Sequence, residues 1–234
     1  MLEQLDTKML ESYSDLGYTL FDLNDDSLIN TVEDEVQALW GVDQTPHGCA
    51  QRQQDAWKQC PSVHNLALHP TVLNILRQLY GEEPRAFQTL NFKLPTQQMT
   101  HTDSVHFSNV EREKMCGVWV ALEDVDRENG PLMYYPGIHN RWYLNNLDGY
   151  ESYQEWECMI QKTLEGIEPE YGVMKKGEVM IWSANLLHGG APAIDSSRTR
   201  WSQVTHYYFG DGPFFSPLAR KFHDQEWKIV DWIK

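Results

Sequence analysis

The hydrophobic period of the chain changes at residues 86–122, AFQTLNFKLPTQQMTHTDSVHFSNVEREKMCGVWVAL. Before this segment, apolar residues recur every three or four positions, as they do in amphipathic helices. From residue 86 onward, apolar and polar residues alternate, which is typical of strands with one buried face. The alternation predicts six strands, which are Ala86–Lys93, Gln98–Asp103, Met115–Leu122, Leu132–Tyr135, Glu178–Trp182 and Trp201–Phe209.

Helices are expected upstream. One covers residues 2–15, a second runs from Asp26 or Ser27 to about Trp40, and Thr71 is expected to cap a third that ends at Gly81. A short strand at 17–21 separates the first two, and residues 43–66 show no clear pattern. Helices followed by a run of short strands favour an α+β fold with a β-sandwich or barrel core.

The length of 234 residues fits a single domain, 1–234. We expect a mainly helical part at 1–85 and a strand core at 86–210. A helical or irregular insertion lies at 140–170 within that core, and a tail covers 211–234.

Composition excludes several function classes. The net charge of −15 argues against nucleic acid or an anionic membrane as a partner, because both require a basic surface. No apolar run is long enough to span a membrane, and the first residues lack the apolar core of a signal peptide, so a cytoplasmic location is expected. The four cysteines show no CxxC spacing, so neither a zinc knuckle nor a disulfide framework is predicted.

Candidate metal ligands lie at His101 and Asp103, with a second histidine at His188. Side chains two positions apart on an extended segment point to the same side. Two histidines and one carboxylate leave three positions of an octahedral metal open, an arrangement typical of non-haem Fe(II) oxygenases. Arg200, twelve residues after His188, is placed to hold a dicarboxylate. A His-x-Asp pair also arises by chance, with the aspartate capping a turn.

The order of motifs adds weight to the metal interpretation. The His-x-Asp pair is followed by the apolar run 117–122, the acidic turn 123–130, the segment 131–139, the run 176–182, His188-Gly-Gly and the strand opened by Arg200. From about residue 88 to 210, this order strongly resembles the phytanoyl-CoA dioxygenase family of Fe(II)/2-oxoglutarate-dependent oxygenases. The segment Tyr13–Tyr18 resembles that family's opening segment too.

The resemblance implies a double-stranded β-helix, a jelly-roll or cupin-like barrel, with the N-terminal helices packed on one sheet. It implies that His101, Asp103 and His188 bind Fe(II), and that Arg200 binds the distal carboxylate of the co-substrate 2-oxoglutarate. Arg198 is the alternative to Arg200. The implied activity is hydroxylation of a C–H bond of a small-molecule metabolite by O2, with oxidative decarboxylation of 2-oxoglutarate to succinate and CO2.

Further residues are candidates for the same cavity. Trp119 matches a family position beside the co-substrate, and Asn91 and Gln98 are candidate donors to its carboxylates. Each also has a structural reading as a core or turn residue. The substrate pocket is expected to include His106, Tyr134, Trp182 and Trp201.

Two other function classes stay open at this point. One is a jelly-roll binding protein without turnover, although the complete ligand set argues against a decayed site. The other is a cupin-like isomerase or hydrolase that uses zinc or nickel, with Arg200 holding its substrate. The fold does not choose the substrate. Scarce positive charge makes a coenzyme A ester less attractive than a small polar or saccharide-like metabolite, and the oligomeric state cannot be read from the sequence.

Overall fold

The structure is a computed structural model, and it describes residues 7–40, 52–109, 114–141, 146–224 and 231–234. The helices are α1 (Thr7–Leu16), α2 (Asp26–Trp40), α3 (Pro61–Ala67), α4 (Pro70–Tyr80), α5 (Tyr153–Thr163) and α6 (Pro217–His223). The strands are β1 (Tyr18–Asp22), β2 (Arg52–Gln54), β3 (Arg85–Phe92), β4 (Ser108–Asn109), β5 (Met115–Ala121), β6 (Leu132–Tyr135), β7 (Glu170–Tyr171), β8 (Glu178–Ser183), β9 (Leu187–Gly190), β10 (Ser202–Tyr208) and β11 (Phe214–Phe215).

Two antiparallel sheets form the core of the molecule. The large sheet has the order β1-β8-β5-β10-β3-β2, and the small sheet has the order β7-β6-β9. Apolar side chains from both sheets, among them Trp119, Met180 and Tyr134, pack together between them. The two sheets therefore enclose one hydrophobic layer, as expected for a jelly-roll barrel.

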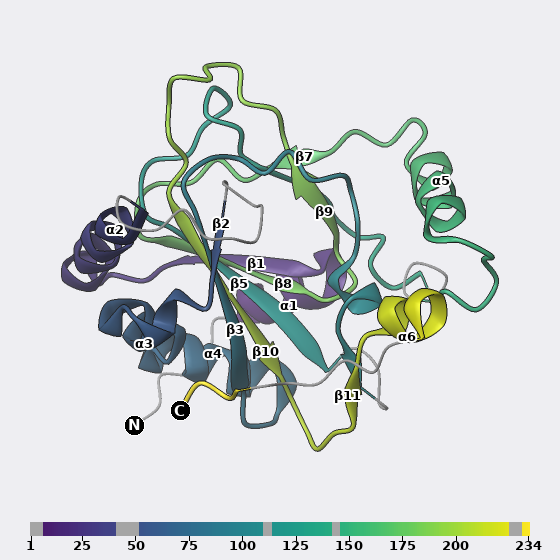
Figure 1. Ribbon diagram of the computed structural model, residues 1–234, viewed down its shortest axis with the longest axis horizontal. Helices are drawn as coiled ribbons and strands as arrows, with labels where there is room; N and C mark the ends of the chain where they lie inside the picture. Colours follow the sequence, from purple (N-terminus) through teal and green to yellow (C-terminus); the bar gives the residue numbers. More distant parts are fainter. Residues whose placement is uncertain (1–6, 41–51, 110–113, 142–145, 225–230) are drawn as a thin grey trace.

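The other face of the large sheet is covered by helices. In α2 the buried residues Ile29, Val32 and Val36 lie on one side of the helix, because their spacing follows its period. They share a second core cluster with residues of α3, α4 and the large sheet. Figure 1 shows α2, α3 and α4 on one side of the molecule, with α5 and α6 at the opposite end. N-terminal helices packed on one sheet are thus confirmed. None of the helices in the described ranges is both long and apolar enough to cross a membrane.

Five of the six predicted strands are confirmed, with ends that differ by at most one residue. The prediction for Gln98–Asp103 is wrong. Only His101 bridges another strand residue, His188, and Asp103 begins a short 3-10 turn at 103–105. The Asp103 carbonyl accepts from the N–H groups of His106 and Phe107, so its backbone bonds locally instead of joining a ladder.

The third predicted helix is confirmed, but its expected cap is wrong. The α4 helix begins at Pro70, and His69 is the N-cap, whose ring accepts from the Thr71 N–H. Proline at the first helical position has a φ angle that suits the helix, and the cap lies two residues upstream of the predicted one. Gly81 ends the helix at φ 68°, as predicted.

Several elements had no counterpart in the sequence prediction. Among them are β2 and most of α3, within the unassigned residues 43–66, and β9, which has only four residues, two of them glycine. The short strands β4, β7 and β11 and the helix α6 were not predicted either. Of the predicted first helix, residues 2–6 lie outside the described ranges, and the rest corresponds to α1. The single-domain division of the chain stays a prediction.

Candidate metal centre and its cavity

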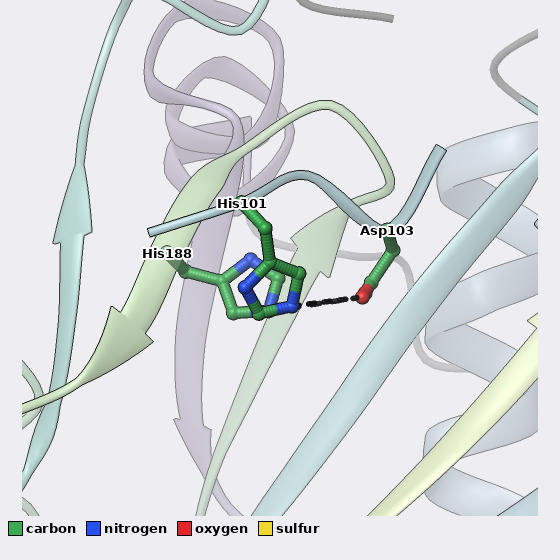
Figure 2. Close-up of side chains that lie close together, drawn as sticks. All are labelled: His101, Asp103 and His188. Atoms are coloured by element: carbon green, nitrogen blue, oxygen red, sulfur yellow. Dashed lines mark ion pairs between the residues drawn. The ribbon is translucent and has the colours of Figure 1, made fainter. Parts of the chain in front are cut away.

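The three predicted metal ligands converge. Their ligand atoms all lie within 4.8 Å of one another, and all three side chains are buried. His101 and Asp103 come from the segment after β3, and His188 comes from β9. The backbones of His101 and His188 exchange two hydrogen bonds, of 2.9 and 3.0 Å, which hold the two segments together. Figure 2 shows the two imidazole rings side by side, facing the Asp103 carboxylate.

Each imidazole is oriented by a backbone carbonyl. The Nδ1 of His101 lies 2.8 Å from the Met99 carbonyl, and that of His188 lies 2.9 Å from the Leu186 carbonyl. A ring whose Nδ1–H donates to a carbonyl presents its Nε2 lone pair for a metal. Both Nε2 atoms lie 3.8 Å from Oδ1 of Asp103. The three donors therefore face one common point.

The carboxylate of Asp103 is held by Trp182. The indole Nε1–H donates to Oδ2 of Asp103 over 2.8 Å, which leaves Oδ1 facing the two histidines. Trp182 lies opposite Gly117 on the neighbouring strand. A Cβ at position 117 would lie 2.6 Å from the indole nitrogen, so the glycine makes room for this ring. Trp182 was predicted as a pocket wall, and its bond to Asp103 was not foreseen.

The protonation states suit a divalent cation. Burial is the main cause that lowers the pKa of His101, to about 3, so the ring is neutral at pH 7. Burial alone would raise the pKa of Asp103, but His188, His206 and His101 and the Trp182 N–H together lower it to about 2. Two neutral imidazoles and one carboxylate are a donor set that binds Fe(II) and leaves three coordination positions open.

The three ligands open onto a cavity of about 360 Å³ between the sheets. Besides the ligands, its wall includes Trp119, Gln98, His106, Trp182 and Arg200, all of which were predicted for the site. It also includes residues that the sequence did not single out for a role in the site, among them Arg52, Gln54, Gln88, Leu90, Phe92, Phe107, Val204 and His206.

Arg200 is a buried cation in this wall. It is 4% exposed, and its guanidinium lies 5.6 Å from the ring centres of both Phe92 and Trp119. Nη1 donates to Ser202 Oγ over 3.2 Å, whereas Nε has no partner among the described residues. Burial lowers the pKa of Arg200 to about 10, so it is still charged at pH 7. A buried guanidinium without a carboxylate partner in the described part of the chain fits an anionic ligand.

Arg198, the alternative to Arg200, lies outside the cavity. Its Nη1 pairs with the Asp126 carboxylate over 2.9 Å, and its side chain is 35% exposed. The Arg200 N–H donates to the Lys93 carbonyl just before β10, which holds this segment beside the end of β3. Of the two arginines, Arg200 is the one that the fold brings to the metal centre.

Gln98 and His106 lie close to the ligands. The Nε2 of Gln98 is 3.2 Å from Nε2 of His101, and the ring centre of His106 is 5.7 Å from that of His101. Both side chains therefore border the candidate metal position. Their roles towards co-substrate and substrate stay predictions.

Three predicted site residues lie elsewhere. Asn91 donates to Gln203, which in turn donates to the Val63 carbonyl of α3, so Asn91 faces the helices. Alternation along β3 places Gln88, Leu90 and Phe92 on the cavity side instead. Trp201 packs against Trp40 of α2, with ring centres 5.4 Å apart, and Tyr134 packs against Tyr18 at 4.8 Å. Neither of these two aromatic residues is part of the cavity wall.

A fourth histidine was missed. The Nδ1–H of His206 donates to Oε1 of Gln88 over 2.9 Å, and its Nε2 lies 3.8 Å from Oδ2 of Asp103. Val204 and His206 line the cavity together with Arg200. The sequence signal for His206 is strand alternation, because every second residue counted from Arg200 faces the cavity side, and His206 is one of them.

Comparisons with known proteins find similarity in both sequence and fold. The sequence profile of the phytanoyl-CoA dioxygenase (PhyH) family matches residues 4–200. A probable phytanoyl-CoA dioxygenase of Caenorhabditis elegans is 26% identical over 146 residues, which are 55% of this chain and 45% of that protein. The human peroxisomal phytanoyl-CoA dioxygenase is 25% identical over 134 residues, 51% of this chain and 38% of that protein. The chain thus spans less than half the length of these two relatives.

Solved structures share the fold. The non-haem alpha-ketoglutarate-dependent carbocyclase SnoK from nogalamycin biosynthesis superposes with a TM-score of 0.73 at 20% identity, covering 95% of this chain and 90% of SnoK. EctD from S. alaskensis, solved with 2-oxoglutarate and 5-hydroxyectoine, gives 0.71 at 19% identity, covering 88% and 76%. The predicted α+β double-stranded β-helix is therefore confirmed. With its His-Asp-His triad intact, the chain belongs to the phytanoyl-CoA dioxygenase family of Fe(II)/2-oxoglutarate-dependent oxygenases.

Proposed function

We propose that the chain is an Fe(II)/2-oxoglutarate-dependent oxygenase that hydroxylates a C–H bond of a small organic molecule. The observation that carries this proposal is the combination, in one cavity, of the His101/Asp103/His188 cluster and the buried Arg200 guanidinium. A metal site alone would also suit an isomerase. A metal site beside an anion site suits an enzyme that uses a dicarboxylate as a co-substrate.

Each of these residues has a defined task in the proposal. His101 and His188 hold Fe(II) as neutral ligands, and Asp103 cancels one of its two charges. Arg200 binds the distal carboxylate of 2-oxoglutarate, with Ser202 beside it and the Trp119 ring as the wall. When bound, iron and 2-oxoglutarate supply the oxidising chemistry, which consumes O2 and yields succinate and CO2. The apolar residues between the sheets exclude water from the reacting groups.

The presence of Asp103 bears on the outcome of the reaction. Related halogenases lack this carboxylate, which leaves a position for halide. Here the carboxylate is present, and Trp182 fixes it. Hydroxylation, or a related desaturation, is therefore the proposed outcome.

The substrate is proposed to be a small molecule. The EctD structure named above holds 5-hydroxyectoine together with 2-oxoglutarate. The cavity of about 360 Å³ suits ligands of that size class. A cytoplasmic location also stays a prediction, which cell fractionation would test.

The test is succinate formation from 2-oxoglutarate in the presence of O2, Fe(II) and ascorbate. We expect slow succinate release without added substrate, and faster release with the correct one. Arg200→Gln should need much more 2-oxoglutarate for the same rate. Turnover of an added compound with Zn(II) or Ni(II) and no 2-oxoglutarate would favour the isomerase or hydrolase alternative. If succinate formation does not rise above background with Fe(II) or any other metal, at any metal concentration, the silent binding protein is favoured.

A further inference from the structure

The cavity has a second cation, Arg52, on the edge strand β2. This strand pairs with β3 so that Arg52 lies opposite Phe92 and Gln54 opposite Leu90. Phe92 and Leu90 line the cavity, and so do Arg52 and Gln54, whereas Gln53 between them is buried with the opposite orientation. Strand alternation therefore places the Arg52 side chain on the cavity side of β2.

Arg52 has no acidic partner in the described part of the chain. Other arginines do, because Arg77 pairs with Glu83 over 2.6 Å and Arg198 with Asp126 over 2.9 Å. The chain carries 34 acidic residues against 19 basic ones, so an unpaired arginine inside a cavity is not a consequence of scarce carboxylates. Partly buried positive charge without a counterion favours a bound anion.

Arg52 reaches the cavity from β2, whereas Arg200 reaches it from the segment that leads into β10. Burial is the main cause that lowers the pKa of His106 and His206, and the Arg52 charge adds to the lowering at both rings. Arg52, His106 and His206 all line this cavity.

The charges of the proposed complex leave Arg52 uncompensated. Fe(II) carries two positive charges and 2-oxoglutarate two negative ones, while Asp103 and Arg200 cancel each other. Asp103 is the single carboxylate among the described residues of the cavity wall. The remaining positive charge belongs to Arg52, and one negative group on the substrate would balance it.

Neutral donors accompany Arg52. Because Oε1 of Gln88 accepts from His206, the amide N–H2 of Gln88 is left to donate. Gln54, two residues from Arg52 on the same face of β2, supplies another amide. Guanidinium and amide N–H groups together match the planar oxygens of a carboxylate. Phe107 adds an apolar surface for the carbon skeleton.

We propose that Arg52, with Gln54 and Gln88, binds a carboxylate of the substrate, so that the substrate class is small organic monocarboxylic acids. This proposal rests on the proposed function, since it takes Arg200 to be occupied by 2-oxoglutarate. The acid is anchored at the β2–β3 wall while another part of its skeleton faces the metal.

The test compares acids with matched neutral amides on the anaerobic protein loaded with Fe(II) and 2-oxoglutarate. The probes are a set of short-chain and arylalkyl carboxylates, beginning with 3-phenylpropionate, each with its primary amide, and calorimetry measures the dissociation constants. The wild type should bind at least one acid about ten- to a hundredfold more tightly than its amide. Arg52→Gln should remove that preference, and Arg52→Lys should keep part of it. Arg77→Gln, an equal change of charge outside the cavity, is the matched control and should keep it in full.

Three outcomes would overturn the proposal. They are equal affinity of acids and amides for the wild type, no binding of any acid in the set, and an unchanged preference in Arg52→Gln. The dissociation constant of 2-oxoglutarate is measured in parallel. If Arg52→Gln weakens 2-oxoglutarate instead of the acid, Arg52 belongs to the co-substrate site and the proposal is wrong. If the wild type fails to bind 2-oxoglutarate at all, the proposed function is wrong. The affinities of acid and amide for the Fe(II)-loaded protein then still test whether Arg52 binds a carboxylate.

Discussion

At the scale of single residues, hydrogen bonds to the protein orient each of the three candidate metal ligands. Backbone carbonyls bond to Nδ1 of His101 and of His188, and the Trp182 indole N–H donates to Oδ2 of Asp103. The Nε2 atom of each ring and Oδ1 of Asp103 face the candidate metal position, and the amide of Gln98 lies beside Nε2 of His101. This preorganisation lowers the cost of binding a metal, because the ligands need not be reoriented.

Removal of the carboxylate should abolish the activity. Asp103→Ala leaves two neutral ligands, and we expect no 2-oxoglutarate-dependent succinate formation and a metal affinity lower by more than about a hundredfold. Metal titration and the succinate assay measure the two effects. Retained turnover in this variant would show that the ligand assignment is wrong.

The orienting hydrogen bond of Trp182 can be tested separately. Trp182→Phe keeps an aromatic ring and removes the donor to Asp103, so metal affinity should fall by about 10- to 100-fold while the fold is kept. Trp156→Phe is the matched control, because the Trp156 indole N–H is buried without a partner in the described structure and lies in another core cluster. Equal metal affinity in the two variants would contradict a role for the hydrogen bond.

The two neighbouring arginines should differ in their effect on the co-substrate. Arg200→Gln removes a buried charge-assisted contact, so the dissociation constant of 2-oxoglutarate should rise by about ten- to a hundredfold with metal binding intact. Arg198→Gln breaks only the surface pair with Asp126 and should leave that constant unchanged. The reverse result would transfer the role to Arg198.

At the scale of elements, strand register decides which side chains reach the cavity. The β3 strand presents Gln88, Leu90 and Phe92 to the cavity, and its neighbour β10 presents Val204 and His206. Between β5 and β8, the register places Gly117 directly opposite Trp182. A side chain at position 117 would occupy the space of the indole, so the register and the glycine together allow the bond to Asp103.

Gly117→Ala tests this element-level dependence. The added methyl group should displace the Trp182 indole and lower the metal affinity by at least about tenfold. Because both changes act through one hydrogen bond, the double variant Gly117→Ala/Trp182→Phe should lose less affinity than the sum of the single effects. Gly149→Ala is the control, since a Cβ there meets no atom within 4 Å. Additive losses in the double variant would argue that Gly117 acts in another way.

At the scale of the whole molecule, two apolar layers surround the large sheet. One layer lies between the sheet and the helices, and the other lies between the two sheets. The metal centre is built at the second layer from the segment 101–103 and from β9, which are more than 80 residues apart in sequence. Binding of a metal therefore ties remote parts of the chain together, and folding stability should depend on it.

Metal loading should raise the melting temperature of the protein. A cation present at about 100 times its dissociation constant stabilises the folded state by about 2.7 kcal/mol. For a chain of this length, that corresponds to roughly 5–10 °C. Anaerobic thermal unfolding with and without Mn(II), a redox-stable substitute for Fe(II), measures the shift. Asp103→Ala should show almost none of it, and an equal shift in that variant would place the metal elsewhere.

The sequence by itself determined the chemistry of the site and the class of fold. The spacing of His101 and Asp103, the later His188, and the run of alternating strands after residue 86 are local patterns, and local patterns can be read along a chain. The pairing of His101 with His188, and the existence of β9, were not readable along the chain, because both depend on backbone partners far away in the sequence.

Only the tertiary structure decided which face of each strand borders the cavity. Alternation says that Gln88 and Asn91 lie on opposite faces of β3, but it does not say which face looks towards the metal. In most amphipathic sheets, the hydrophobic residues identify the face that points inward. Here the large sheet is covered by helices on one side and by the small sheet on the other, and all residues of β5 and β10 are buried. With both faces buried, the sequence carries no signal of inside and outside, so Asn91 was assigned to the site while Gln88, His206 and Arg52 became visible only in the folded chain.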